Sequence, residues 1–106
     1  MLPKKHRIVL PFSLARPRSV TSPYFVMKAE KNTLGYGRVG IVMRKKLFRS
    51  AVERHAVKRR ILHGSREALK KSYDILIFPS ASLKNVPPGK LKEALHDSFE
   101  ALSRTP

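Results

Sequence analysis

The segment YDILIF, residues 73–78, constrains the fold more than any other stretch of this chain. It is apolar on both faces and ends at Pro79, which is typical of an interior strand rather than an edge strand. We therefore expect it to join a sheet with the other strands of the chain.

Two further strands precede this segment. The first is YFVMKA, residues 24–29, and the second is RVGIVM, residues 38–43. The connecting stretch KNTLGYG contains two glycines, which favour a hairpin turn. We expect these two strands to pair with each other as an antiparallel hairpin.

A first long helix is predicted after the second strand. Ser50 and Glu53 form a capping box, in which each side chain bonds a free backbone N–H of the first turn, so the helix should begin at Ala51. It should run to about Lys71, with Gly64 as a weak point. The positions expected to face the core are Val57, Ile61, Gly64 and Ala68.

A second helix is predicted after PPG, residues 87–89. The residues on its apolar face are Leu91, Leu95, Phe99 and Leu102. The order strand, strand, helix, strand, helix indicates an α+β domain whose helices pack on one face of the sheet. The other face of the sheet is expected to be free.

The 106 residues fit one domain, which we predict to be a single RNA-binding domain over residues 1–106. Within it, residues 1–22 form a basic arm interrupted by Pro3, Pro11 and Pro17. We expect this arm to be extended, with at most one short helical turn near Phe12 to Ala15.

The positive charge is confined to one part of the chain. Residues 1–71 contain 19 Lys and Arg against three acids, whereas residues 72–106 contain four of each, so the first part carries the whole net charge of +16. A small soluble domain needs a net charge of only about 2 to 8. The excess favours a polyanionic partner, either nucleic acid or an anionic membrane surface.

The first helix concentrates this charge on one face. Arg54 and Lys58 are four residues apart, so they are neighbours on the helix surface and repel each other by about 0.2 to 0.5 kcal/mol. A polyanion would compensate this repulsion. The residues predicted to contact it are Lys45, Lys46 and Arg49 in the preceding loop and Arg54, His55, Lys58, Arg59 and Arg66 on the helix.

Among polyanions, RNA fits this surface best. A membrane-binding helix presents a wide apolar face, whereas the apolar stripe here is narrow and is needed by the core. DNA-binding proteins concentrate contacts on a short recognition helix, whereas these cations are spread over arm, loop and helix. The chain has no cysteine, no apolar run of about 20 residues and no signal peptide, so a cytoplasmic location is expected.

The stretch RVGIVMRKKLFRSAVERHAVKRR, residues 38–60, resembles the signature of the bacterial ribonuclease P protein subunit. That signature has an Arg-Val-Gly strand start, paired lysines, and a helix with Ala-Val, an arginine, Asn-Arg and a closing Lys-Arg pair. The matching residues are Lys45 and Lys46, Ala51 and Val52, Arg54, and Lys58 with Arg59. The resemblance extends over roughly residues 24–103.

This chain departs from the family pattern in two places. His55 and Ala56 stand where the family usually has Asn-Arg. The family's N-terminal helix with paired phenylalanines is replaced by VLPFSLARP, in which only Phe12 remains. These changes are typical of a divergent member.

The resemblance implies a four-stranded sheet in a ribosomal-protein-like two-layer sandwich with a left-handed βαβ crossover. It also implies a protein that binds the catalytic RNA subunit and the 5′ leader of precursor tRNA, and so assists magnesium-dependent removal of the leader. In this family the RNA subunit is the catalyst, and Mg²⁺ is held mainly by the RNA subunit and the substrate. No membrane and no obligate protein partner are implied.

The residues themselves indicate no catalytic and no metal site in this chain. Its four histidines lie in separate segments, and its seven acids form no pair suited to proton transfer or metal binding. If Phe25 and Met27 point to the core, their neighbours face the free side of the sheet. The residues predicted to bind the leader are Phe12, Tyr24, Val26 and Lys28.

Two other functions remain open from the sequence. A structural ribosomal protein of similar fold would share the charge but lack the paired lysines followed by Arg54, Lys58 and Arg59. An independent metal-dependent nuclease would need clustered carboxylates, which the sequence does not contain.

Overall fold

The computed structural model describes residues 4–8 and 14–104, which form a four-stranded sheet with two long helices. The strands are β1 (Arg18–Thr21), β2 (Phe25–Lys31), β3 (Arg38–Ile41) and β4 (Tyr73–Pro79). The helices are α1 (Ala51–Gly64) and α2 (Pro88–Arg104), with short 3-10 helices η1 (Lys4–His6), η2 (Arg66–Lys70) and η3 (Ala81–Asn85). The α+β class predicted from the sequence is confirmed.

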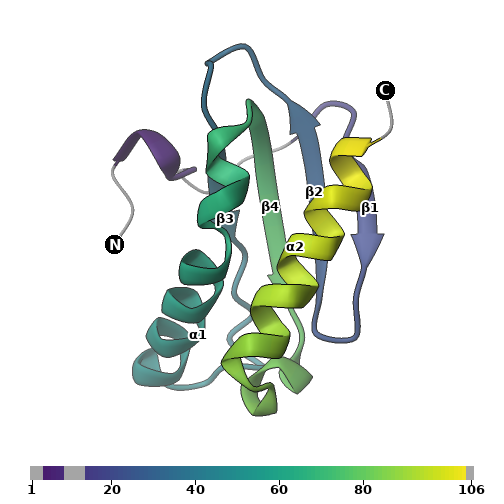
Figure 1. Ribbon diagram of the computed structural model, residues 1–106. Helices are drawn as coiled ribbons and strands as arrows, with labels where there is room; N and C mark the ends of the chain where they lie inside the picture. The colour runs from purple at the N-terminus through teal and green to yellow at the C-terminus, as the bar shows by residue number, and fades with distance from the viewer. Residues whose placement is uncertain (1–3, 9–13, 105–106) are drawn as a thin grey trace.

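The sheet has the order β1-β2-β4-β3, so β4 lies in its interior as predicted. Both α1 and α2 lie on one face of the sheet (Figure 1). Val57, Ile61 and Ala68 are buried on this side, as is the whole predicted stripe of the second helix, Leu91, Leu95, Phe99 and Leu102. The two-layer arrangement with both helices on one face is therefore confirmed. The opposite face, which neither α1 nor α2 covers, is the uncovered face of the sheet in residues 4–8 and 14–104.

The predicted hairpin between the strands β2 and β3 is wrong. β4 lies between them, antiparallel to β2 and parallel to β3. The connecting loop crosses the end of β4 instead of turning back, because Asn32 binds β4 and the loop together. Its backbone N–H donates to the Ser72 carbonyl at 2.9 Å, and its side-chain amide donates to the Asp74 carboxylate at 2.9 Å and to the Tyr36 carbonyl at 3.2 Å.

The chain passes from β3 through α1 to the parallel strand β4 by a left-handed crossover (Figure 1). Connections of this kind are right-handed in almost all proteins.

Gly37, just before β3, allows the chain to pass close to η2. A Cβ added there would lie 2.8 Å from the Leu69 Cα and 2.8 Å from the Lys71 carbonyl oxygen, so no larger residue fits without moving backbone.

The first helix begins where the sequence predicts but ends earlier. The Ser50 hydroxyl accepts a hydrogen bond from the Glu53 N–H at 3.0 Å, which starts α1 at Ala51. Instead of running to Lys71, α1 ends at Gly64, and the chain continues as η2. The second helix begins at Pro88, inside the PPG stretch, where the missing N–H of proline costs no helical hydrogen bond.

The N-terminal segment contributes more to the sheet than the sequence indicates. Residues 18–21 form the edge strand β1, paired antiparallel with β2. At the opposite edge, Arg7 bridges Val39 in parallel, and the Ile8 N–H donates to the Val39 carbonyl at 3.0 Å. The predicted helical turn near Phe12 begins outside the described residues, and Leu14 and Ala15 are not helical.

Arg38 and Asp74 form a partly buried ion pair on the uncovered face of the sheet. Two N–H groups of Arg38 donate to the two carboxylate oxygens, each at 2.8 Å, and the Asp74 side chain is only 8% exposed. Burial alone would raise the pKa of Asp74. The hydrogen bonds from Arg38 and Asn32 outweigh burial and hold the pKa of Asp74 below its ordinary value.

We predict that Asp74→Asn destabilises the protein at neutral pH but not in acid. The depressed pKa stabilises the fold fully above the pKa of an unfolded aspartate, about 4, and this contribution is lost as the pH falls through the lower folded pKa. Loss of the pair should lower the free energy of unfolding by about 2 kcal/mol at neutral pH.

Urea denaturation of both proteins between about pH 2 and pH 7 measures this difference. Asp97→Asn, on the exposed side of α2, is the matched control and should have no comparable effect. A difference that stays constant down to the lowest pH would contradict a role for the ionised Asp74.

Candidate nucleic-acid interface

The exposed face of α1 carries cations that the fold does not neutralise. His55, Lys58 and Arg59 are all exposed. Among residues 4–8 and 14–104, none of their side chains makes a hydrogen bond or an ion pair. The repulsion between neighbouring cations on this face therefore remains uncompensated in the free protein.

Arg54 differs from these residues because it has partners in the fold. Its Nη1 donates to the Phe48 carbonyl at 2.9 Å and to the Arg49 carbonyl at 3.0 Å. These bonds connect α1 to the loop that precedes it. Arg54 therefore stabilises the start of the helix, a role that its position in a basic run did not indicate.

The loop before α1 presents three predicted cations to solvent. Lys45, Lys46 and Arg49 are exposed. The loop is fixed by Phe48, which is fully buried, and by the Phe48 N–H, which donates to the Arg44 carbonyl at 3.1 Å. A buried aromatic residue thus holds the loop in place, and the cations of the loop remain exposed to solvent.

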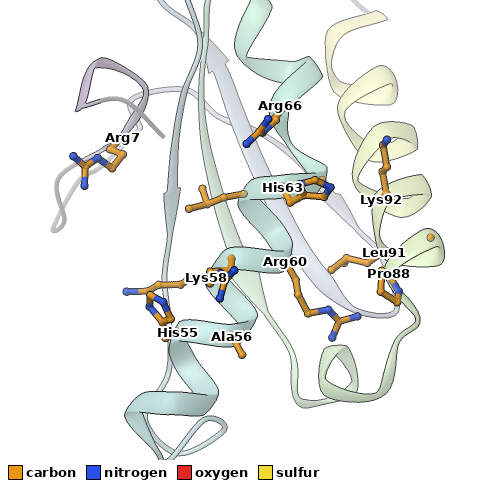
Figure 2. A pocket seen from close by; sticks show the side chains of 14 residues that line it. Arg7, His55, Ala56, Lys58, Arg60, His63, Arg66, Pro88, Leu91 and Lys92 are labelled. Carbon is orange, nitrogen blue, oxygen red and sulfur yellow. The ribbon is translucent and has the colours of Figure 1, made fainter. Parts of the chain in front are cut away.

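One cavity of about 970 Å³ adjoins the basic face of α1 and brings several predicted residues together. His55, Lys58, Arg59 and Arg66 all line it. Sequence reasoning missed the other basic residues that line it, which are Arg7, Arg60, His63 and Lys92 (Figure 2). Arg60 and His63 were visible in the helix sequence, but only the tertiary fold brings Arg7 and Lys92 to α1.

Arg60 also has a structural role. Its guanidinium donates to the carbonyls of Leu83, at 3.2 Å, and Val86, and so binds α1 to η3 and the segment before α2. An ion pair of 3.2 Å between Glu53 and Lys84 makes a second connection between α1 and η3. The basic helix is therefore fixed against the elements that follow β4.

The uncovered face of the sheet presents an aromatic residue that the sequence reading did not select. Val26 and Lys28 are half-buried on this face, as predicted, and Phe78 lies directly opposite Val26 on β4. The Lys28 Nζ lies 5.4 Å from the centre of the Phe78 ring. The alternation of side chains along YDILIF would have indicated Phe78, had the pairing of β2 with β4 been known.

The other two residues predicted to bind the leader are Tyr24 and Phe12. Tyr24 lies just before β2 and is half-buried against the hydrophobic core. Phe12 lies outside the described residues. Ile8 packs on the sheet face opposite α1 and α2, since its Cβ would lie 3.1 Å from a Cβ added at Gly40.

The described residues contain no group of three His, Cys, Asp or Glu side chains that could hold a metal ion. Within the same residues, no helix is long and apolar enough to cross a membrane. The chemistry that this surface offers is therefore the binding of anions by exposed guanidinium and ammonium groups.

Comparisons with known proteins agree on one family. The protein-family model described as Ribonuclease P matches residues 10–103. The ribonuclease P protein component of Marinobacter nauticus is 27% identical over 108 residues, with 96% of this chain and 82% of that protein covered. The corresponding protein of Thermotoga petrophila is 37% identical over 68 residues, which cover 61% of this chain and 57% of that protein.

Solved structures show the same fold. The RNase P protein from Thermotoga maritima has a TM-score of 0.70 and 28% identity, covering 85% of this chain and 84% of its own. The Staphylococcus aureus RNase P protein has a TM-score of 0.77 and 24% identity, covering 92% of this chain and 95% of its own. The crossover through α1 is thus part of a fold that solved RNase P proteins share.

We predict that Arg54→Ala and Lys58→Ala have different effects on stability. Arg54→Ala leaves the Phe48 and Arg49 carbonyls without their donor and should lower the free energy of unfolding by about 1 to 2 kcal/mol. Lys58→Ala relieves repulsion and introduces the best helix former, so stability should be unchanged or slightly higher. Urea denaturation of the two variants tests this, and equal losses would show that Lys58 also stabilises the helix.

Proposed function

The chain belongs to the ribonuclease P protein family, and from that premise we propose that it is the protein subunit of a ribonuclease P. In this role it binds the catalytic RNA subunit and the 5′ leader of precursor tRNA, and so assists removal of the leader. The observation that carries the proposal is the exposed pair Lys58 and Arg59, for which the described fold provides no counter-charge. The family match also argues against a ribosomal protein of similar fold.

The RNA subunit is proposed to dock on the exposed face of α1 and the loop before it. Phosphates would neutralise Lys45, Lys46, Lys58 and Arg59 and release the counterions that these cations hold in the free protein. His55 replaces an amide of the family pattern and can donate to a phosphate through either ring nitrogen, depending on its tautomer. The structural bonds of Arg54 and Arg60 keep this face in place for docking.

The leader is proposed to lie on the uncovered face of the sheet. Phe78 offers a ring on which an unpaired base can stack, and Lys28 beside it offers a positive charge to the adjoining phosphate. Val26, directly opposite Phe78, widens this apolar surface. Phe78 therefore joins the predicted residues Val26 and Lys28 in the proposed leader site.

The protein is not proposed to supply the catalytic groups. Cleavage of a phosphodiester by activated water commonly uses metal ions held by oxygen ligands. The described residues offer no carboxylate cluster for Mg²⁺, so we assign the metal ions to the RNA subunit and the substrate. The contribution of this chain is then to neutralise phosphate charge and position the leader, in the cytoplasm, where precursor tRNA is processed.

The proposal is tested by adding the purified chain to a ribonuclease P RNA at low magnesium concentration. Leader removal from precursor tRNA should appear or accelerate, because the protein lowers the repulsion between RNA subunit and substrate. The chain without RNA should not cleave at any magnesium concentration. No stimulation of cleavage, or cleavage that survives removal of all RNA, would contradict the proposal.

We predict that the double variant Lys58→Ala, Arg59→Ala loses RNA affinity without losing stability. Affinity for the RNA subunit should fall severalfold at moderate salt. The slope of log affinity against log salt should become shallower by about one to two, since each neutralised phosphate contributes about 0.7 to 0.9.

Filter binding across a salt series and a melting curve on the same preparation measure both quantities. Lys31→Ala, Arg104→Ala is a control with the same loss of charge, at exposed positions at the ends of β2 and α2. Lower stability with unchanged affinity would mean that these residues stabilise the helix and do not bind RNA.

A further inference from the structure

A groove lies between the second half of α1 and the first turn of α2, on one flank of the cavity described above. Arg60 and His63 point from α1 toward α2, and Leu91 points back toward α1, with Pro88 and Lys92 at the rim (Figure 2). The groove is distinct from the exposed side of α1 that carries His55 and Lys58, although both belong to the same continuous cavity.

Two glycines determine the shape of this groove. At Gly64 the helices touch, because a Cβ added there would lie 2.7 Å from the Leu95 Cδ1 and 3.4 Å from the Lys92 Cα. At Gly89 the opposite holds, since an added Cβ would meet no atom within 4 Å. The groove is therefore closed at Gly64 and open at Gly89.

The lining combines apolar surface with positive charge and contains no acid. Six of the residues around the cavity are Ala, Leu, Gly or Pro and eight are Arg, Lys or His. All seven acids of the chain are among the described residues, and none of them lines the cavity. A ligand that fits such a lining has an apolar surface and a negative charge.

Arg60 has a fixed position in the groove. The guanidinium of Arg60 is held in one plane by the carbonyls of Leu83 and Val86, and Pro88 beside it is exposed, whereas Leu91 is buried. Unpaired bases of RNA stack on planar guanidinium groups and apolar side chains, while their phosphates bind cations. A nucleotide has both parts that this groove would bind.

We propose that this groove receives one unpaired nucleotide of the RNA subunit. Its base lies against Pro88 and the Arg60 guanidinium, and its phosphate lies between His63 and Lys92. The inference rests on the proposed function, because RNA that docks on Lys58 and Arg59 passes the mouth of the groove. An RNA duplex is too wide to enter, whereas an extruded base fits a cavity of this size.

Crosslinking tests the proposal directly, because the chain has no cysteine and a single introduced thiol can be labelled without ambiguity. Gly89→Cys, labelled with an azidophenacyl group and bound to the RNA subunit, should crosslink to one or two neighbouring nucleotides that are unpaired. Ala101→Cys is the control, exposed on the same helix and more than three turns away, and should give no specific crosslink.

A filling variant provides a second test. Gly89→Leu fits the backbone, occupies the groove and keeps the charge, so affinity for the RNA subunit should fall by roughly tenfold, with stability unchanged or higher. Ala101→Leu should bind RNA as the unaltered protein does.

The outcomes separate this inference from the proposed function. If the unaltered protein does not bind the RNA subunit, the proposed function itself fails. If the unaltered protein binds, but Gly89→Leu binds equally well or Gly89→Cys crosslinks only to paired nucleotides, the groove is not a nucleotide site and the docking face of α1 is unaffected.

Discussion

The position of β4 between β2 and β3 determines the rest of this fold. Seven residue pairs join β4 to β2 and four join it to β3, and Ile75 and Ile77 on its helix-facing side are almost completely buried. Because β3 and β4 are parallel neighbours, the chain between them must cross one face of the sheet, and α1 makes that crossing. The same strand thus places the basic helix on one face and Phe78 on the other.

The cations of this protein differ in whether other groups of the fold bind them. Arg38, Arg54 and Arg60 bind a carboxylate or backbone carbonyls and hold strands, loop and helix in place. Lys58 and Arg59 have no such partners among the described residues. The first group of cations keeps this surface rigid, and the second group leaves its positive charge without a counter-charge. Binding of an external polyanion would therefore cost little conformational entropy.

Local patterns predicted the elements well, but pairing between distant segments could not be read from them. The N-cap at Ser50 and the apolar stripe of α2 are local, and both appear as expected, although the Glu53 carboxylate pairs with Lys84 instead of completing the capping box. The predicted hairpin is wrong because the residues of KNTLGYG suit a turn and a loop across the end of another strand equally well. The hydrogen bonds of Asn32 that favour the loop are made with Ser72 and Asp74, which are distant in the sequence. The resemblance supplied the crossover, whereas Phe78, Arg7 and Lys92 needed the tertiary fold.

The strand order also has a consequence for how the chain reaches this structure. β1 and β2 are joined by a short turn and can pair as soon as both exist, whereas β3 has no strand of the sheet as neighbour until β4, which begins 32 residues after β3 ends, has docked. Closing that long segment before its contacts form has an entropic cost, so the docking of β4 is the natural slow step of folding. Until then α1 carries its cations on a segment without a sheet beneath it. An RNA that binds α1 early would therefore act on folding as well as on the folded protein.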